Sequence, residues 1–494
     1  MSHYLLAIDQ GTTSSRAIVF SQQGNPISSH QMDLTQFFPH EGWVEQDPLQ
    51  MWRYTLECCK QALLKKNISA KQVSAIGITN QRETTILWDK KTGQPIYPAI
   101  VWQDRRTSEF CKQFYNHPIY SSLANKTGLL LDPYFSASKI VWILENVPLA
   151  RLKASRGELL FGTVDTFLLW QFTKGRVHAT DATNASRTLL FNIHTQEWDK
   201  EILAAFEIPE TILPDVYDSS AEFGYVDEEF FGRPILIAAL IGDQQAATVG
   251  QACFSQGMIK STYGTGCFML LNTGNGLVQS QNRLLSTITY RLKGKVTYGL
   301  EGSIFSAGAT IKWLRDKLKF IHIAAESETL ARSLEDTDGV YCVPAFSGLG
   351  APYWDPQARA AILGLTYNST PQHIVRAALE AVAYQTQDLL LAMAADSQID
   401  FQLLRVDGGM AANNWLMQFL ADILNLTIQQ PSCIETTALG AAYLAGLQIG
   451  FYQSLEEIST LWQENKKFLP TMDKKQRDFL YSGWKKAVEK VLSV

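Results

Sequence analysis

The apolar positions at the start of the chain predict a β-hairpin. Residues 4–8 and residues 17–20 are apolar and β-prone, and the turn between them contains Gly11 and several hydroxyl side chains. Two such runs around a glycine-containing turn are typical of antiparallel strands. The first strand ends in a carboxylate, Asp9.

Three further apolar runs predict buried strands, at residues 73–79, 235–241 and 403–406. Each run is followed at once by charged residues, polar residues or glycine. Open α/β sheets place their ligands at the carboxyl ends of parallel strands. We therefore expect the residues after these strands to include the chemistry of the protein.

Two long amphipathic segments predict helices. One runs from about residue 49 to residue 64, and the other from about residue 371 to residue 395. Each begins with a capping residue followed by proline, which favours a helix start. A third helix is predicted over residues 303–315, with Gly308 in its opening turns. The small residues at 435–446 predict a helix that packs closely against a neighbour.

The hairpin pattern occurs twice. Residues 258–272 again form a strand, a Gly-Thr turn and a strand, and Gly264 corresponds to Gly11 at an offset of 264 − 11 = 253 in a chain of 494 residues. A repeat near the start of each half indicates a duplicated domain. We expect an α/β fold with one domain over residues 1–250 and a second over residues 251–494.

Composition narrows the class of protein. The chain has 46% hydrophobic and 18% charged residues and a formal charge of −5, which is typical of a globular protein and unfavourable for nucleic-acid binding. Its longest apolar run, residues 235–241, is far below the ~20 residues needed to cross a bilayer. Asp9 interrupts the first apolar run, so no signal peptide is expected. We expect a cytoplasmic protein with no membrane insertion, whose seven cysteines are thiols.

The turn of the first hairpin carries groups that suit a polyphosphate. Backbone amides and hydroxyl side chains can donate to phosphate oxygens, Arg16 supplies positive charge, and Asp9 can hold a divalent cation. The second hairpin, at Gly264, could contact the same phosphates from the other half. The competing interpretation is an ordinary polar hairpin tip.

The ends of two predicted strands carry groups that suit a hydroxyl-bearing acceptor. Arg82 and Glu83 follow the strand over 73–79, and together they can donate to and accept from hydroxyl groups. Asp243 follows the strand over 235–241, where a charge must be solvated, paired or functional. The alternatives are a surface ion pair for Arg82 and Glu83 and a helix N-cap for Asp243.

The remaining candidates carry weaker signals. Trp102 and Tyr134 could form the walls of a small pocket or could be core anchors. Gly409 lies at a strand-to-helix turn that suits a base or phosphate resting on bare backbone, although any tight turn can use glycine. The chain contains neither a G-x-x-x-x-G-K-[ST] loop nor a G-x-G-x-x-G motif after its first strand.

The motifs together resemble a known family. Asp-Gln-Gly-Thr-Thr-Ser-Ser-Arg at 9–16, Thr-Asn-Gln-Arg-Glu-Thr-Thr at 79–85, Gly-Asp-Gln-Gln-Ala-Ala at 242–247 and Tyr-Gly-Thr-Gly-Cys-Phe at 263–268 occur in the family's order. The chain is similar over its whole length to the FGGY carbohydrate kinases of the actin/hexokinase/Hsp70-like ATPase superfamily. Among them it resembles the members that phosphorylate glycerol.

The resemblance implies two ribonuclease-H-like domains of the actin-like ATPase type, with the active site in the cleft between them. The expected reaction is in-line transfer of the γ-phosphoryl group of ATP to glycerol, giving sn-glycerol 3-phosphate, with Asp243 as general base. The residues implied in glycerol binding are Arg82, Glu83, Trp102, Tyr134, Asp243, Gln244 and Phe268. Those implied in nucleotide binding are Thr12, Thr13, Ser14, Arg16, Thr265, Gly308, Gly409 and Asn413.

The same resemblance implies Mg²⁺ at Asp9 and Asp243, and a homodimer or homotetramer. Two alternatives stay open: a kinase for another polyol or ketose, and a non-catalytic actin- or Hsp70-like nucleotide switch. Some positions depart from the family. Lys312 stands where some members have Gln, and residues 227–233 lack the loop through which some members bind fructose 1,6-bisphosphate. Neither contact is carried over.

Overall fold

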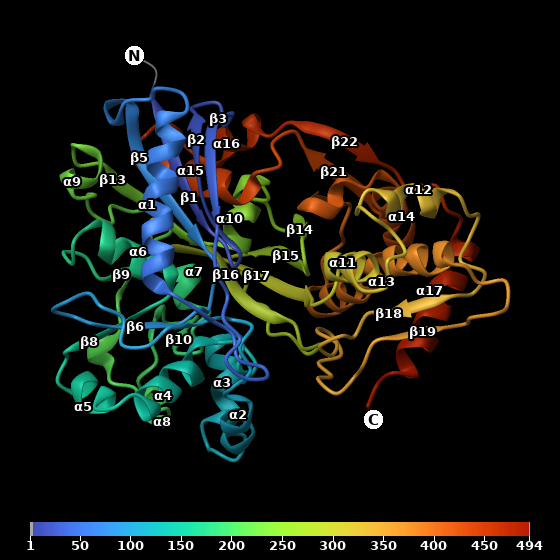
Figure 1. Ribbon diagram of the computed structural model, residues 1–494, viewed down its shortest axis with the longest axis horizontal. Helices are drawn as coiled ribbons and strands as arrows, with labels where there is room; N and C mark the ends of the chain where they lie inside the picture. The colour runs from blue at the N-terminus through green and yellow to red at the C-terminus, as the bar shows by residue number, and fades with distance from the viewer. Residues whose placement is uncertain (1–2, 494) are drawn as a thin grey trace. The chain divides into compact units, whose positions relative to one another are not determined.

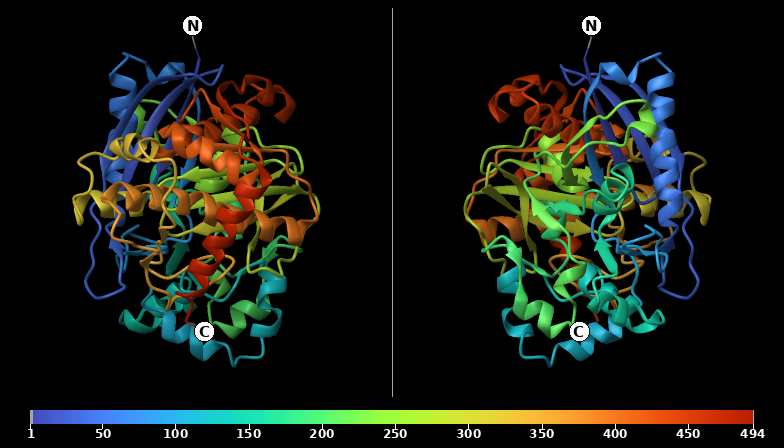
Figure 2. Two further views of the ribbon diagram at one scale, coloured as in Figure 1. Left: turned by 90° about the vertical axis from the view of Figure 1, so that its right-hand side faces the viewer. Right: turned by 90° about the vertical axis from the view of Figure 1, so that its left-hand side faces the viewer.

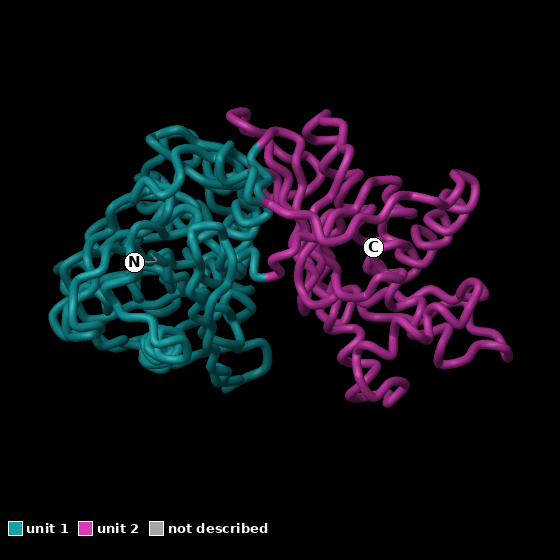
Figure 3. Tube along the Cα trace, turned by 90° about the horizontal axis from the view of Figure 1, so that it is seen from above, with its two compact units in different colours: residues 1–254, 286–298, 435–461 teal, residues 255–285, 299–434, 462–494 magenta. Residues whose placement is uncertain are grey.

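The computed structural model describes residues 3–493, which form two compact units (Figure 3). Unit 1 contains the chain up to Phe254 together with Ser286–Tyr298 and Glu435–Leu461. Unit 2 contains Ser255–Leu285, Gly299–Ile434 and the chain from Trp462 onward. The compact units therefore differ from two consecutive halves, because two later segments belong to unit 1.

Unit 1 is built on a five-stranded sheet in the order β13-β5-β1-β2-β3 (Figure 1). Its strands are β1 (Tyr4–Gln10), β2 (Ser14–Ser21), β3 (Pro26–Asp33), β5 (Val73–Asn80) and β13 (Leu236–Gly242). Strands β1, β2 and β3 form an antiparallel meander, while β5 and β13 run parallel to β1. The predicted hairpin and the predicted strands at 73–79 and 235–241 are confirmed.

Helices cover both faces of this sheet. Helix α1 (Pro48–Leu64) begins at the predicted N-cap Asp47, whose side chain accepts from the Leu49 amide, and runs along β2 and β3 (Figures 1 and 2). Helix α15 (Thr436–Gln448) packs on β1, β5 and β13. Side chains alternate along a strand. Accordingly Ile76 and Ile78 join the core that contains α1, whereas Gly77 lies against α15.

The close approach of α15 explains why residues 435–461 belong to unit 1. Helix α15 crosses α10 (Asp243–Gly250), and both helices carry glycine at the contact. A Cβ atom added at Gly440 would lie 1.9 Å from the Ala246 carbonyl oxygen, and one added at Gly250 would lie 1.9 Å from the Thr436 carbonyl oxygen. Only glycine allows two helix backbones to come this close. The interpretation of residues 435–446 as a close-packing helix is confirmed.

The other elements of unit 1 are short and surround the sheet. The helices are α2 (Ser108–Phe114), α3 (Tyr120–Thr127), α4 (Ser136–Asn146), α5 (Ala150–Ser155), α6 (Val164–Phe172), α7 (Ala182–Ala185), α8 (Lys200–Ala205), α9 (Glu228–Phe231) and α16 (Leu455–Leu461). The strands are β4 (Glu45–Gln46), β6 (Ile86–Asp89), β7 (Ala99–Ile100), β8 (Leu159–Gly162), β9 (Ala179–Asp181), β10 (Phe191–Asn192), β11 (Glu197–Trp198) and β12 (Asp215–Tyr217).

Unit 2 repeats the strand order of unit 1. Its sheet contains β17 (Lys295–Ile304), β15 (Cys267–Gly274), β14 (Ile259–Tyr263), β20 (Leu403–Asp407), β21 (Thr427–Pro431) and β22 (Glu464–Phe468), in that order. Strand β14 is antiparallel to β15 and parallel to β20, as β1 is to β2 and β5. Strand β16 (Leu285–Leu292) precedes β17. The matching topology supports the duplication that the two hairpins predicted.

The helices of unit 2 include α11 (Gly308–Asp316), α12 (Glu326–Arg332), α13 (Pro371–Ser397), α14 (Asn414–Leu424) and α17 (Lys474–Glu489). A small pair of strands, β18 (Tyr341–Val343) and β19 (Ala361–Leu363), completes it. The long helix predicted from residue 371 is confirmed. The helix predicted over 303–315 begins only at Gly308, because residues 295–304 continue strand β17. In residues 3–493, no helix combines the length and apolar character needed to cross a membrane.

Candidate active site

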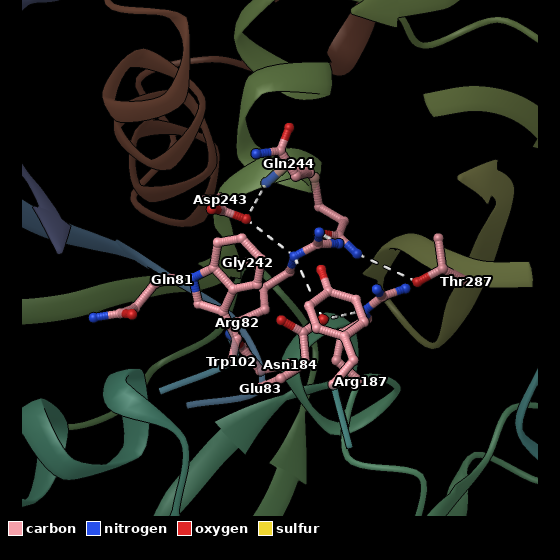
Figure 4. A network of polar contacts seen from close by, with 12 residues as sticks. Gln81, Arg82, Glu83, Trp102, Asn184, Arg187, Gly242, Asp243, Gln244 and Thr287 are labelled. Atoms are coloured by element: carbon pink, nitrogen blue, oxygen red, sulfur yellow. Dashed lines mark hydrogen bonds and ion pairs between the residues drawn. The ribbon is translucent and has the colours of Figure 1, made fainter. Parts of the chain in front are cut away.

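Arg82 and Asp243 come together at the carboxyl ends of two neighbouring parallel strands. Asn80 at the end of β5 lies beside Gly242 at the end of β13, so the residues that follow emerge next to each other (Figure 4). Arg82 Nε lies 3.0 Å from Asp243 Oδ1. The Arg82 side chain is 2% exposed and that of Asp243 is 29% exposed. The ion pair is therefore buried on the arginine side, while part of the carboxylate remains accessible.

Glu83 occupies a constrained turn beside this pair. Its φ of 59° lies in the left-handed region, and the Thr84 amide donates to the Arg82 carbonyl oxygen at 2.7 Å across it. A side-chain-bearing residue in this conformation is uncommon, and such outliers concentrate at functional sites. The Glu83 carboxylate oxygen Oε1 lies 3.9 Å from Arg82 Nε. Both side chains are almost completely buried, so the alternative of a surface ion pair does not hold.

Arg187 completes the cluster and was not a sequence prediction. Its Nε donates to Glu83 Oε1 at 2.6 Å, and its side chain is fully buried. Two guanidinium groups and two carboxylates thus balance one another, which reduces the cost of burying each charge. Arg187 lies in a mixed polar stretch of the sequence, and nothing in that stretch connects it with residue 83. Only its isolation as a cation among small residues could have drawn attention to it.

Hydrogen bonding to a neighbouring segment fixes the backbone before Asp243. The Gly242 amide donates to Thr183 Oγ1 at 2.9 Å, and the Thr183 hydroxyl donates to Asp181 Oδ1 at 2.8 Å. A Cβ atom added at Gly242 would lie 2.7 Å from Arg82 Cδ, so a side chain here would displace the arginine. Gly242 is the N-cap of α10, and Asp243 is the first residue of that helix. The interpretation of Asp243 as N-cap is therefore wrong by one residue.

Glutamines on α10 extend the network. Arg82 Nη1 donates to Gln245 Oε1 at 3.2 Å, and Gln245 Nε2 donates to Thr287 Oγ1 at 3.3 Å. Gln244 is 8% exposed, and its backbone N–H donates to Asp243 Oδ1 at 2.7 Å. Gln245 thus holds the second end of the Arg82 guanidinium, a role that the sequence did not indicate.

Trp102 and Tyr134, the two rings predicted to form an aromatic wall, pack against each other. Their ring centroids lie 5.6 Å apart in an edge-to-face arrangement. The Trp102 indole Nε1 donates to Thr12 Oγ1 at 2.9 Å, which connects the wall to the turn of the first hairpin. The guanidinium carbon of Arg187 lies 5.6 Å from the Tyr134 ring centroid. These rings therefore stand beside the charged cluster, and their part in a pocket stays a prediction.

Asp9 is the residue before the last in β1 of the same sheet and is half-buried. Burial is the largest of the effects that raise the pKa of Asp9 to about 7, and repulsion from Asp243 comes next. The positive charge of Arg16 acts in the opposite direction. Arg16 faces Asp9 across the hairpin and forms an ion pair with Glu435. Thr13 is exposed at the tip of the hairpin and Ser14 begins β2. The carboxylates of Asp9 and Asp243 repel each other, and a bound cation would relieve this repulsion.

The hairpin turn of unit 2, between β14 and β15, accepts hydrogen bonds from the start of α11. The Gly308 amide donates to the Gly264 carbonyl oxygen at 3.0 Å, and the Ala309 amide donates to the Thr265 carbonyl oxygen at 3.0 Å. Helix α11 therefore begins against this turn, where Thr265 is exposed. Phe268 follows on β15 and is half-buried.

The glycine turn after β20 combines a tight contact with open backbone: a Cβ atom added at Gly408 would lie 2.5 Å from the Tyr263 carbonyl oxygen. A Cβ atom at Gly409 would meet no atom within 4 Å, so this backbone is open. Asn413 is the N-cap of α14, and its Oδ1 accepts from the Leu416 amide at 2.9 Å. Within unit 2 the predicted nucleotide residues thus lie on the turn between β14 and β15, at the start of α11 and on the turn between β20 and α14.

The structure brings together a subset of the predicted residues. In unit 1 these are Asp9, Thr12, Arg82, Glu83, Trp102, Tyr134, Asp243 and Gln244. Thr265, Phe268, Gly308, Gly409 and Asn413 belong to unit 2. The roles assigned to all of these residues stay predictions. The seven cysteines are present as thiols, as expected.

Comparison with known families gives a match to both parts of the chain. Residues 4–250 match the N-terminal domain of the FGGY family of carbohydrate kinases, and residues 259–449 match its C-terminal domain. The chain is 59% identical over 494 residues to the glycerol kinase of Coxiella burnetii (strain Dugway 5J108-111), covering 100% of this chain and 98% of the relative. It is 58% identical over 493 residues to glycerol kinase 1 of Pseudomonas aeruginosa, with 100% of both chains covered.

Solved structures agree with these relatives. The glycerol kinase of Plasmodium falciparum with ADP matches with a TM-score of 0.93 at 40% identity, covering 100% of this chain and 99% of that chain. A gluconate kinase from Lactobacillus acidophilus matches with a TM-score of 0.87 at 19% identity, covering 99% and 97%. The second likeness concerns the fold alone.

Proposed function

We propose, since the chain belongs to the FGGY family of carbohydrate kinases, that it transfers the γ-phosphoryl group of ATP to glycerol and forms sn-glycerol 3-phosphate. Relatives at 56–59% identity that bear the name glycerol kinase support this choice of acceptor. The observation that carries the proposal at the site is the buried ion pair between Arg82 and the partly accessible carboxylate of Asp243.

The acceptor binds through complementary polar groups and an aromatic wall. Arg82 and Gln244 donate to its hydroxyl oxygens, and the carboxylates of Glu83 and Asp243 accept from its hydroxyl groups. Trp102, Tyr134 and Phe268 contact the carbon backbone. A site built from buried polar groups rejects molecules that leave those groups unpaired. This chemistry favours a small polyol.

Asp243 acts as the general base. Its carboxylate accepts the proton of the terminal hydroxyl while that oxygen attacks the γ-phosphorus and the bond to the β-phosphate breaks. Arg82 Nε and the backbone N–H of Gln244 hold Asp243 Oδ1 at 3.0 Å and 2.7 Å, which fixes the carboxylate before the acceptor binds. Phosphoryl transfer depends mainly on such positioning and on stabilisation of charge.

The nucleotide binds through the two hairpins and the glycine turns. Thr12, Thr13, Ser14 and Arg16 of the first hairpin and Thr265 of the second contact the phosphates, while Gly308, Gly409 and Asn413 contact the rest of the nucleotide. Backbone amides in glycine-containing turns are suited to anionic oxygens. The open backbone at Gly409 supports the last part of this assignment.

Asp9 and Asp243 are the residues that would hold Mg²⁺. They fit the ion because burial, and after it repulsion from Asp243, raises the pKa of Asp9 to about 7, and a bound cation would offset both effects. Magnesium in kinases is commonly held by one or two carboxylates together with substrate phosphates, so two aspartates are sufficient. When bound, the ion neutralises negative charge on the phosphates.

A panel of acceptors from three to six carbons, assayed with Mg²⁺ and ATP, tests the proposal. We expect glycerol to give the highest kcat/KM. A clear preference for a pentulose would favour a kinase for another substrate of the family. ATP turnover that no acceptor stimulates would favour a non-catalytic nucleotide switch.

Two further parts of the proposal concern the whole protein. We propose a cytoplasmic homodimer or homotetramer, with family domains over residues 1–250 and 251–494. Light scattering of the purified chain, compared with its mass of 55.3 kDa, distinguishes a monomer from either assembly.

A further inference from the structure

Lys139 is a buried cation that none of the steps above uses. It lies in the first turns of α4 (Ser136–Asn146), and its side chain is fully buried. A positive charge near a helix N-terminus is opposed by the helix dipole, and a buried ammonium group loses its hydration. Burial lowers its pKa to about 8. The chain thus retains a lysine at a position where two effects disfavour its charge.

Three consecutive carbonyl groups compensate for this cost. Lys139 Nζ donates to the carbonyl oxygens of Pro133 at 2.7 Å, Tyr134 at 2.6 Å and Phe135 at 3.0 Å. An ammonium group has three hydrogens, so this set uses its full donor capacity. Side chains on a helix lean toward its N-terminus, which allows Lys139 to reach back to the segment before α4.

The segment that Lys139 holds carries one wall of the candidate site. Tyr134 meets the Trp102 ring edge-to-face, and the guanidinium carbon of Arg187 lies 5.6 Å from the Tyr134 centroid and 5.4 Å from the Phe135 centroid. Ser136, the next residue, donates through its hydroxyl to the Glu83 carbonyl oxygen at 3.0 Å. The carbonyl groups that accept from Lys139 therefore belong to the part of the chain that touches both Trp102 and Glu83.

We propose that Lys139 is a positioning residue for the acceptor site, whose ammonium group fixes residues 133–135 and thereby holds Tyr134 in place against Trp102. The inference rests on the proposed function, because it predicts an effect on acceptor binding. Lys139 does not touch the acceptor and acts through the backbone that carries Tyr134.

Kinetics of Lys139→Met test the proposal. Because the lost contacts support acceptor binding, we expect the KM for glycerol to rise at least about 5-fold while the KM for ATP changes less than about 2-fold. Lys126→Met is the matched control, since Lys126 forms ion pairs with Asp199 and Glu201 in the same unit. The control is expected to change thermal stability without changing the KM for glycerol.

A double-mutant cycle separates positioning from general destabilisation. If Lys139 acts through Tyr134, adding Lys139→Met to Tyr134→Ala should raise the KM for glycerol by less than about 2-fold. An equal rise in both backgrounds overturns the proposal. Wild-type protein that phosphorylates no glycerol would instead refute the proposed function, so the two failures are distinguishable.

A pH profile keeps the test available even if Lys139→Met does not fold. The carboxylates of Glu83, Asp104 and Asp132 favour the charged form of Lys139, whereas the nearby Cys111 stays an uncharged thiol because burial raises its pKa to about 12. As pH rises above about 8, Lys139 loses one of its three donors, and we expect the KM for glycerol of the wild type to rise. Lys139→Arg stays protonated and should lack this rise. A wild-type KM for glycerol that is flat from pH 7 to about 9 contradicts the proposal.

Discussion

Arg82 Nε lies 3.0 Å from Asp243 Oδ1, so the proposed general base is held by a cation from the neighbouring strand. We expect Asp243→Asn to lower kcat by about 10²- to 10⁴-fold, because the amide cannot take up the hydroxyl proton. Glycerol-dependent ADP release measures the effect.

The control for this substitution is Asp215→Asn, which changes an exposed aspartate on β12 of the same unit. It should leave kcat unchanged. Product formation by Asp243→Asn at the wild-type rate would remove Asp243 from the role of general base.

Arg187 is expected to be as important for Glu83 as Arg82 is for Asp243. Arg187→Met removes the 2.6 Å contact to Glu83 Oε1 and leaves a buried carboxylate with less compensation. Breaking a buried pair typically lowers the free energy of unfolding by about 3–5 kcal/mol. We expect a loss of this size in chemical denaturation, together with a higher KM for glycerol.

Arg176→Met is the matched comparison, since Arg176 pairs with Asp227 but is 55% exposed. Exposed pairs contribute at most about 1 kcal/mol. If both variants lost the same stability, the buried cluster would have no special weight.

We expect replacement of Asp9 to increase stability and to abolish activity. Its pKa rises from 3.8 to about 7 on folding, so the folded state disfavours the ionised carboxylate. Below about pH 4 the group is protonated in both states, and above about pH 7 the full cost is present. At about 1.4 kcal/mol for each pKa unit, Asp9→Asn should raise the free energy of unfolding at pH 8 by up to about 4 kcal/mol.

This gain should vanish as the pH approaches 4, and Asp9→Asn should lose Mg²⁺-dependent turnover. Asp33→Asn, an exposed change on β3 near the same hairpin, should follow the wild type at every pH. A stability difference for Asp9→Asn that does not vary with pH, or an unchanged Mg²⁺ response, would contradict the assignment.

The crossing of α10 and α15 predicts a site that tolerates no side chain. Gly440→Ala places a Cβ atom 1.9 Å from the Ala246 carbonyl oxygen, so the helices must separate. We expect the free energy of unfolding to fall by about 3 kcal/mol. Gly276→Ala, whose Cβ would meet only the Thr273 carbonyl oxygen at 3.8 Å, is the control and should be close to neutral. Equal stability of the two variants would show that the helices adapt.

Much of the fold could be predicted from local pattern. Continuous apolar runs predicted β1, β2, β5, β13 and β20, and capping residues predicted the starts of α1 and α13, because these signals lie within a few neighbouring residues. The repeated hairpin indicated the duplication for the same reason. The predicted start of the helix over 303–315 was wrong, because strand β17 continues through Ile304.

Local pattern alone predicts which residues lie at or just after the strand ends, among them Asp9, Arg82, Glu83 and Asp243, because a strand end is marked by a change from apolar to polar positions. The partners of these residues depend on the folded structure. Arg187 reaches Glu83 across 104 positions of the chain, and α15 joins unit 1 from near residue 440. Such contacts depend on how elements far apart in the sequence pack together, and the local pattern of apolar and polar residues does not specify that packing.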